Sequence, residues 1–338
     1  MERPGVMRVL AGCAVLAALV AGCGEKKDVL RPSPQRFQLM LDYFPNADHA
    51  PIYAAKAAGD FNAAGLDLQI RQPADPSAPI KQVAAGRVDL AISYEPEVLR
   101  ARDRGLHVVA VGALVHGPLT SIISLPHGRV ARPADLAGKT VGTAGIDYQS
   151  AYLDSILASQ NVPKSKVKVR NVGFNLVPAL VSGKVDAILG GFWNYEAIDL
   201  QQRHKKPNVI RIEQAGVPTY DELVFVANAD ALDREGPLIR RFIQALARGA
   251  HRLERDPQAG VKALDAANRD LDPKLQAAAV RATLPRFAAP RGHPYGWLDP
   301  AQWKRFGEWM QAHGLIKAVA AGASTNRFLP GEGLPTLK

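Results

Sequence analysis

Two patterns of apolar residues alternate along most of the chain. Short, nearly continuous apolar runs of strand type occupy residues 37–41, 66–70, 88–92, 108–114 and 121–125. Between them, apolar residues recur at helical spacing in residues 49–58, 80–85 and 95–104, and the first two of these segments stop at a glycine. Strands that alternate with helices in this way predict an α/β sandwich built on a mostly parallel sheet.

A second unit repeats the same order of elements. Its strand-type runs are residues 140–143, 167–169 and 185–189, and its helical segments are residues 148–159 and 177–181. The sequence GRVDLAI at residues 86–92 matches GKVDAIL at residues 183–189. In each, a helix ends at glycine just before a buried strand. The repeat predicts two similar α/β lobes.

One further strand and a set of helices follow the second unit. Residues 222–228 form a strand that returns the chain to the first lobe, and no sheet-forming unit is left for a third lobe. We expect the helices that follow to cover the first lobe and the hinge; they are residues 238–253, 257–267, 274–283 and 300–313. The predicted lobes are residues 37–125 with 224–338, and residues 126–223.

The N-terminus has the pattern of a bacterial export signal. Two arginines precede residues 9–22, an uncharged stretch that is too short to span a bilayer. The stretch ends in LVAGC at Cys23, which resembles a lipobox. We expect residues 1–22 to be removed, Cys23 to carry a lipid and residues 23–36 to form a tether to a membrane, with the body facing the periplasm or exterior. An ordinary cleaved signal peptide with an accidental cysteine is the alternative.

Composition and charge narrow the classes of function. A chain of 338 residues, 47% hydrophobic and 22% charged, fits two folded domains. The formal net charge is +10, but no run of five basic residues occurs, so nucleic-acid binding is not expected. Both cysteines lie in the signal region, which leaves none in the body for disulfides, zinc or nucleophilic catalysis. The eight histidines lack metal-ligand spacing, and no metal or cofactor is predicted.

Aromatic rings and carboxylates follow two of the predicted strands. These loops are residues 93–95 (SYE) and residues 190–196 (GGFWNYE). Ligands of open α/β sheets bind beyond the carboxyl ends of the strands, and closure of two lobes would bring the loops together. Rings stack on flat ligands, and carboxylates accept N–H bonds. The loops therefore predict a trap for a planar, amino-bearing ring, rather than for a sulfonate or nitrate. Separately, we expect the protein to be a monomer and to perform no chemistry on its ligand.

The opening of the body resembles a known family of binding proteins. The sequence LDYFPNADHAPIYAAK at residues 41–56 is similar to the opening of the substrate-binding proteins for thiamine pyrimidine precursors, in the nitrate/sulfonate/taurine-like group of ABC importers. Residues 86–95, 135–142 and 193–196 continue the resemblance, which covers most of residues 37–315. It implies a two-lobed periplasmic-binding-protein fold of type II, a ligand such as hydroxymethylpyrimidine or its formylamino relative, and delivery to a membrane permease.

The candidate ligand contacts combine the strand-end loops with the resemblance. Their alternative roles are ordinary ones, such as a helix-start histidine, a strand-end core tyrosine or a helix N-cap. The candidates are Tyr43, Asn46, His49, Tyr94, Glu95, Thr143, Gly145, Asn175, Trp193, Tyr195, Glu196 and Tyr220.

Three other functions remain as alternatives. The ligand could be another planar ring such as riboflavin, or the protein could be a solute sensor that docks on a kinase. The third is a pyrimidine synthase, because an enzyme with this fold is related to the family. By the resemblance, that enzyme has a histidine and a lysine where this chain has Ser93 and Glu97, and a cysteine-rich segment where this chain has residues 216–222. Without the lysine no Schiff base can form, which argues against the enzyme.

Overall fold

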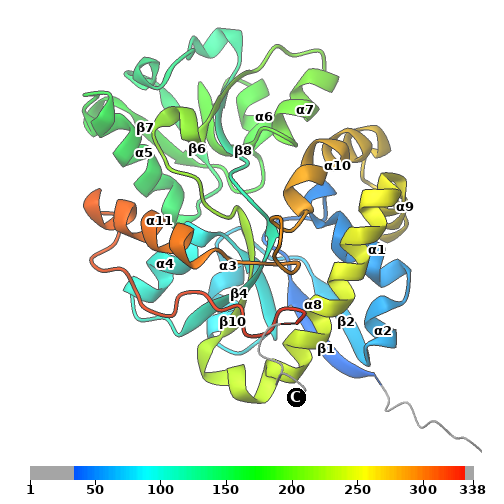
Figure 1. Ribbon diagram of the computed structural model, residues 1–338. Coiled ribbons are helices and arrows are strands. Elements are labelled where there is room, and N and C mark those ends of the chain that lie inside the picture. Colours follow the sequence, from blue (N-terminus) through cyan, green and yellow to red (C-terminus); the bar gives the residue numbers. More distant parts are fainter. Residues whose placement is uncertain (1–33, 332–338) are drawn as a thin grey trace, which may run out of the picture. The chain divides into compact units, whose positions relative to one another are not determined.

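Two five-stranded sheets organise the part of the chain that the computed structural model describes, residues 34–331 (Figure 1). Cys23 and the predicted signal lie outside the described residues. The first sheet has the order β2-β1-β3-β10-β4, with β1 (Gln35–Met40), β2 (Leu66–Arg71), β3 (Leu90–Ser93), β4 (Val108–Val115) and β10 (Leu223–Asn228). The second has the order β7-β6-β8-β5-β9, with β5 (Thr120–Ser124), β6 (Thr140–Thr143), β7 (Lys168–Asn171), β8 (Ala187–Phe192) and β9 (Asn208–Arg211).

The two sheets have equivalent orders, which confirms the prediction of two similar α/β lobes. In each sheet the fourth strand, β10 or β5, is antiparallel to its neighbours, and the first three strands are parallel. Before the central strand β3, the Asp89 carboxylate accepts a hydrogen bond from the Gln38 N–H of β1 at 2.6 Å. Before β8, Asp186 accepts one from the Thr140 N–H of β6 at 2.7 Å. The aspartate of each repeat thus bonds to the neighbouring parallel strand and favours the same register in both sheets.

Helices cover both sheets, and they begin and end close to the predicted bounds. Those of the first lobe are α1 (Ala50–Ala57) after the 3₁₀ turn η1 (Ala47–His49), α2 (Asp60–Ala63), α3 (Ala78–Ala84) and α4 (Glu95–Asp103). Those of the second are α5 (Asp147–Ser159), α6 (Leu176–Val181) and α7 (Glu196–Gln202). The C-terminal helices are α8 (Leu232–Arg255), α9 (Pro257–Ala267), α10 (Pro273–Phe287) and α11 (Pro300–Ala312).

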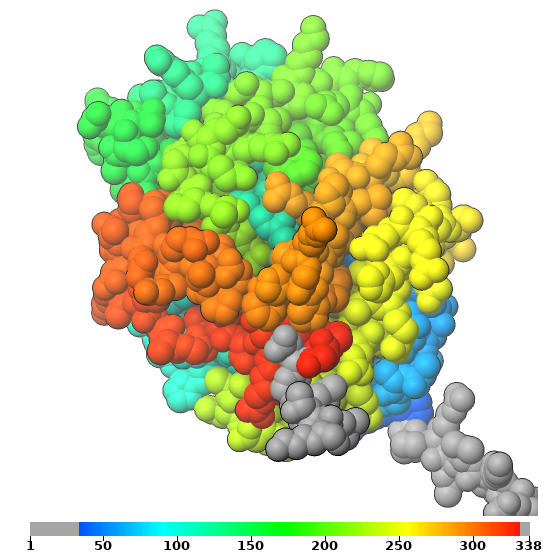
Figure 2. Space-filling view, in the orientation of Figure 1, coloured from blue at the N-terminus to red at the C-terminus, as the bar shows by residue number. Residues whose placement is uncertain are grey.

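The C-terminal helices belong mainly to the first lobe. Helices α8 and α9 pack on α1, and α10 contacts both α9 and α7, so it touches both lobes. Figure 2 shows α10 and α11, in orange, on the face of the molecule where the green second lobe meets the rest. Within residues 34–331, no helix is long and apolar enough to cross a membrane.

The chain passes to the second sheet earlier than the sequence predicted. Residues 121–125 were expected in the first lobe, but β5 pairs with β8 and β9, so the first crossing lies at residues 116–119. Strands β4 and β5 are both fully buried, and a short buried run carries no signal for which sheet it joins. The second crossing ends at β10, close to the predicted boundary. Strand β1 begins within the predicted tether, and the short elements α2, α7 and β9 were not predicted.

Close packing of α8 against α1 leads to a stability prediction at Gly249. A Cβ there would lie 2.3 Å from the Pro51 carbonyl oxygen and 2.7 Å from the Ala55 Cβ. We expect Gly249→Ala to lower the free energy of unfolding by about 1–3 kcal/mol, because the backbone of α1 must move aside. Urea denaturation measures the change, with His251→Ala, exposed on the same helix, as the near-neutral control. A stability equal to that of the control would contradict this close approach.

Candidate ligand-binding site

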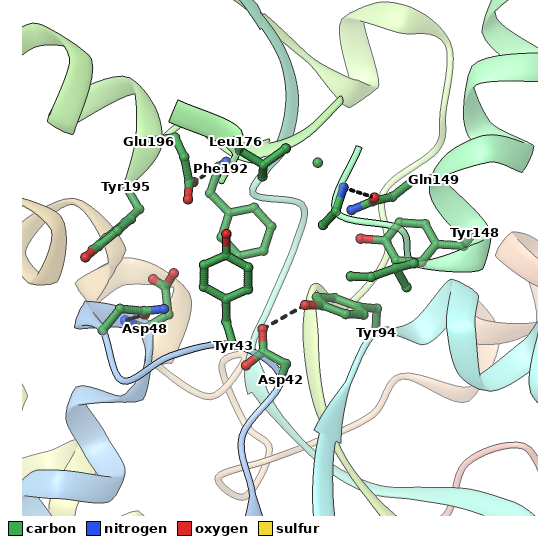
Figure 3. Close-up of a pocket in the computed structure, with 14 residues that line it drawn as sticks. Asp42, Tyr43, Asp48, Tyr94, Tyr148, Gln149, Leu176, Phe192, Tyr195 and Glu196 are labelled. Atoms are coloured by element: carbon green, nitrogen blue, oxygen red, sulfur yellow. Dashed lines mark hydrogen bonds between the residues drawn. The ribbon is translucent and has the colours of Figure 1, made fainter. Parts of the chain in front are cut away.

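A cavity lies between the two lobes, at the carboxyl ends of parallel strands from both sheets (Figure 3). Its first-lobe wall comes from the residues that follow β1 and β3. Its second-lobe wall comes from the ends of β6 and β8 and from the starts of α5, α6 and α7. The lining residues are Asp42, Tyr43, Asn46, Asp48, Tyr94, Ala144, Ile146, Tyr148, Gln149, Leu176, Gly190, Phe192, Tyr195 and Glu196.

The cavity is a narrow slot with aromatic walls. Five of its lining side chains are rings, those of Tyr43, Tyr94, Tyr148, Phe192 and Tyr195. The centre of a water molecule can occupy only about 20 Å³ of the slot. An outer groove that shares four of the slot's lining residues offers about 470 Å³. The aromatic walls favour a flat ring, which offers its faces to them.

Carboxyl groups supply the charge of the slot, and no lysine or arginine lines it. Glu196 begins α7, and its Oε2 accepts a hydrogen bond from the Phe192 N–H at 2.7 Å. Burial is the main cause that raises the Glu196 pKa to about 8. Burial likewise raises the pKa of Asp48 to about 6, against the opposing effects of His49, Asn194 and Thr283. The slot therefore offers hydrogen-bond acceptors, or neutral carboxyl groups, to its contents.

A buried network holds the third carboxylate, Asp42, in place. Its Oδ1 lies 2.9 Å from His49 Nε2, and its Oδ2 accepts a hydrogen bond from the Tyr94 hydroxyl at 2.8 Å. The Asn46 N–H donates to His49 Nδ1 at 3.2 Å, so the ring proton sits on Nε2 and points to Asp42. Both ring nitrogens of His49 are thereby used within the first lobe.

Three hydrogen bonds join the lobes around the slot. The Tyr43 hydroxyl donates to the Phe174 carbonyl oxygen at 2.9 Å, next to the outer groove. From the loop before α7, Asn194 Nδ2 donates to Asp48 Oδ1 and to Thr283 Oγ1, both at 2.6 Å. These bonds require the lobes to be close together, so the structure shows the two lobes closed around the slot.

Five of the twelve predicted contacts line the slot: Tyr43, Asn46, Tyr94, Tyr195 and Glu196. Tyr43, Tyr195 and Glu196 also line the outer groove. His49 lies behind the wall and is fully buried. It was predicted as a ligand contact, but in the structure its ring nitrogens bond to Asp42 and to the Asn46 N–H.

Four predicted contacts lie elsewhere because their polar atoms are bonded at the crossings between the lobes or in the second lobe. Glu95 Oε2 accepts from the Asp221 N–H at 2.7 Å, and the Tyr220 hydroxyl donates to Glu222 at 3.1 Å. Trp193 donates to the Pro118 carbonyl at 3.1 Å. Thr143 Oγ1 is 3.4 Å from the Gly145 N–H, and its neighbour Ala144 lines the slot instead.

The two remaining predicted contacts are surface residues beside the slot. Gly145 has a φ of 81° and lines a separate hollow next to α3 and α4. Asn175 is the N-cap residue of α6, but its side chain makes no capping bond and is exposed. The next residue, Leu176, is the one that lines the slot. Seven of the twelve predicted contacts thus lie outside the slot lining, because neighbouring residues of one loop can face different sides.

Sequence reasoning missed several lining residues. Asp42 and Asp48 lie in the same segment as two predicted contacts, Tyr43 and Asn46. Closeness in the sequence to these contacts could have identified the two aspartates. Tyr148 and Gln149 begin α5 and had been interpreted only as helix residues. Phe192 is in the loop that the sequence singled out, but it was not chosen. Across residues 34–331, no group of three or more His, Cys, Asp or Glu side chains is arranged to hold a metal ion.

Solved structures show the same fold. The alkanesulfonate-binding protein of Xanthomonas axonopodis pv. citri, bound to MOPS, superposes with a TM-score of 0.67 at 19% identity, covering 87% of this chain and 99% of that one. The agreement confirms the two-lobed periplasmic-binding-protein fold.

Sequence comparisons identify the family. A Haemophilus influenzae protein whose name places it in thiamine biosynthesis is 35% identical, over 85% of this chain and 90% of its own. The formylaminopyrimidine-binding protein of Halalkalibacterium halodurans is 32% identical, over 83% and 86%. A 4-amino-5-hydroxymethyl-2-methylpyrimidine phosphate synthase of Legionella pneumophila is 25% identical, over 90% and 95%. The family model described as NMT1/THI5 like matches residues 46–260. The chain therefore belongs to the NMT1/THI5-like family.

Proposed function

We propose that the protein is the solute-binding component of an importer and that it binds an aminopyrimidine precursor of thiamine in the slot. The observation that carries the proposal is the slot itself, which combines five aromatic rings with three carboxyl groups and no cationic side chain. A sulfonate, phosphate or nitrate would meet three carboxyl groups and no cationic side chain there, so its charge would be unpaired. A flat ring that carries N–H donors satisfies both the walls and the carboxyl groups.

Glu196 has the properties needed to recognise the edge of an aminopyrimidine. A carboxyl whose pKa is near 8 holds its proton at neutral pH, so it presents one O–H donor and one carbonyl acceptor. An aminopyrimidine presents a ring nitrogen that accepts next to an amino group that donates. The two edges are complementary, and the name of the Halalkalibacterium relative supports this class of ligand.

The structure around Ser93 and Glu97 supports binding over synthesis. The Ser93 hydroxyl donates to Glu97 Oε2 at 2.6 Å, and both residues are buried outside the slot lining. No lysine lines the slot to form a Schiff base. We therefore propose a protein without catalytic activity, although more distant relatives are synthases.

The proposal includes the cellular context that the sequence predicts. A lipid on Cys23 would hold the body outside the cytoplasmic membrane, where a closed, loaded protein could dock on a permease of the ABC class. A kinase-linked solute sensor would have the same fold and slot. Loss of uptake of the labelled pyrimidine on deletion of the protein would support import, and unchanged uptake with altered gene expression would support the sensor.

A thermal-shift panel tests the ligand class. We expect hydroxymethylpyrimidine or its formylaminomethyl relative to raise the melting temperature, since a ligand at 100 times its dissociation constant adds about 2.7 kcal/mol to the stability. Thiamine, riboflavin and an alkanesulfonate are the comparison compounds. A shift with riboflavin alone would keep the transport role and change the ligand. A shift with the sulfonate alone would contradict the assignment of the slot.

A further inference from the structure

Among the described slot carboxyl groups, Asp48 has a buried oxygen without a hydrogen-bond partner. Its Oδ1 accepts hydrogen bonds from Asn194 Nδ2 at 2.6 Å and from Thr283 Oγ1 at 3.1 Å. Its Oδ2 is buried and has no hydrogen-bond partner. A buried acceptor without a partner carries a desolvation cost that a bonded one does not. The side chain is 1% exposed and lines the slot, so a donor for Oδ2 can come from the contents of the slot.

Closure of the lobes brings this carboxylate toward a second one. Asp48 follows β1 in the first lobe, and Glu196 begins α7 in the second. In Figure 3 both carboxyl groups lie in the region between the rings of Tyr195 and Tyr43. Asp48 is also one of the charges that act on Glu196. Closure of the lobes leaves the buried Oδ2 of Asp48 without a donor unless something in the slot donates a hydrogen bond to it.

The hydrogen bond from Asn194 to Asp48 is a second sign that the lobes are closed. Asn194 comes from the second lobe, and its partners Asp48 and Thr283 come from the first lobe and α10. The bond to Oδ1 can form only when the lobes meet. One oxygen of Asp48 is thus bonded to the opposite lobe, while the other oxygen has no donor.

We propose that Asp48 makes closure of the lobes depend on a ligand that brings an N–H donor to its free Oδ2. It is a specificity-determining residue: a ligand without that donor leaves the carboxylate unpartnered and the closed state unfavourable. The inference rests on the proposed function, since it assumes that the ligand lies in the slot. It goes beyond that function because it assigns both the choice of ligand and the closure of the lobes to one side chain.

Asp48→Asn tests the inference, because the amide keeps one acceptor for Asn194 and supplies its own donor in place of Oδ2. We expect the ligand-free variant to have a smaller radius of gyration by small-angle X-ray scattering than the ligand-free wild type. We also expect its preference for the aminopyrimidine over the analogue without the 4-amino group to fall about tenfold, the effect of one hydrogen bond to a charged group. Asp67→Asn, exposed on β2, is the matched control.

A second variant distinguishes a role of Asp48 in ligand recognition from a purely structural role of Asp48. Asn194→Ala removes the bond across the lobes and leaves Asp48 intact. The preference of this variant for the aminopyrimidine over the analogue without the 4-amino group should therefore equal that of the wild type. Equal radii of Asp48→Asn and the wild type, both ligand-free, would overturn the inference. If the wild type binds no pyrimidine at all, the proposed function fails, and the comparison of radii still decides the dependence of closure on Asp48.

Discussion

Glu196→Gln is expected to weaken aminopyrimidine binding about 10- to 100-fold, because the hydrogen bonds of a charged or proton-sharing carboxyl contribute about 1.5–3 kcal/mol. The amide has nearly the same shape, so the aromatic walls and the closure of the lobes remain. What changes is the edge that faces the ligand, since an amide cannot give up or take a proton as the carboxyl does. Isothermal titration calorimetry at pH 7 measures the affinity of both proteins.

Asp199→Asn is the matched control for this prediction. Asp199 lies on the same helix, α7, and its carboxylate pairs with Arg203 at 2.7 Å in the outer groove rather than in the slot. We expect its affinity to be within about twofold of the wild type, because exposed ion pairs contribute about 0–1 kcal/mol. Equal affinities of Glu196→Gln and Asp199→Asn would place the recognised edge of the ligand away from Glu196.

The free energy of unfolding is expected to fall as the pH rises from 5 to 8, the reverse of the usual behaviour of paired carboxylates. Burial is the main cause that raises the pKa of Asp48 to about 6, of Glu97 and Glu222 to about 7, and of Glu196 to about 8. In the unfolded chain these groups lose their protons near pH 4, whereas the folded state retains them. Their favourable contribution is therefore complete below about pH 4 and is lost as the pH rises through 6 to 8.

The size of this effect follows from a single group. A glutamic acid whose pKa rises from 4.5 to about 7 costs the folded state about 3 kcal/mol above pH 7. We expect a fall of at least about this size between pH 5 and 8 in urea denaturation of the ligand-free protein. Exposed carboxylates such as Asp135, whose pKa the backbone N–H groups of residues 131 and 132 lower, oppose it only weakly.

Glu222→Gln tests the origin of the pH dependence. Glu222 accepts hydrogen bonds from the N–H groups of Leu119 and Thr120 at 2.5 and 2.7 Å and from the Tyr220 hydroxyl, so it joins the two crossings between the lobes. The variant should be less stable at pH 5, because its amide group meets donors, and its stability should change less between pH 5 and 8. A wild-type stability that increases over this range would contradict the buried, proton-retaining carboxyl groups.

Much of the fold could be predicted from the sequence, because strand-type runs and helix-ending glycines have a local physical cause. The GRVDLAI repeat correctly indicated two equivalent lobes, since each copy places an aspartate at the start of a central strand. The sheet that β5 joins could not be predicted, because that choice depends on pairing with β8 and β9 far along the chain.

The same distinction applies to the site. Tyr43 and Glu196 were predicted because they directly follow strands whose carboxyl ends face the other lobe. Trp193 and Glu95 were misplaced because a loop residue one position away can face the hinge, where Pro118 and Asp221 bind them. The unpartnered oxygen of Asp48 becomes visible only when three distant segments, η1, the loop before α7 and α10, are brought together.

The most direct test is a pair of calorimetric titrations of the wild-type protein, one with 4-amino-5-hydroxymethyl-2-methylpyrimidine and one with the same compound lacking the 4-amino group. An aromatic, acceptor-lined slot predicts one-to-one binding of the first and about 10- to 100-fold weaker binding of the second, because carboxyl groups in the slot then lose a donor. Equal affinities for the two compounds, or no binding of either, would contradict recognition of an aminopyrimidine by this slot.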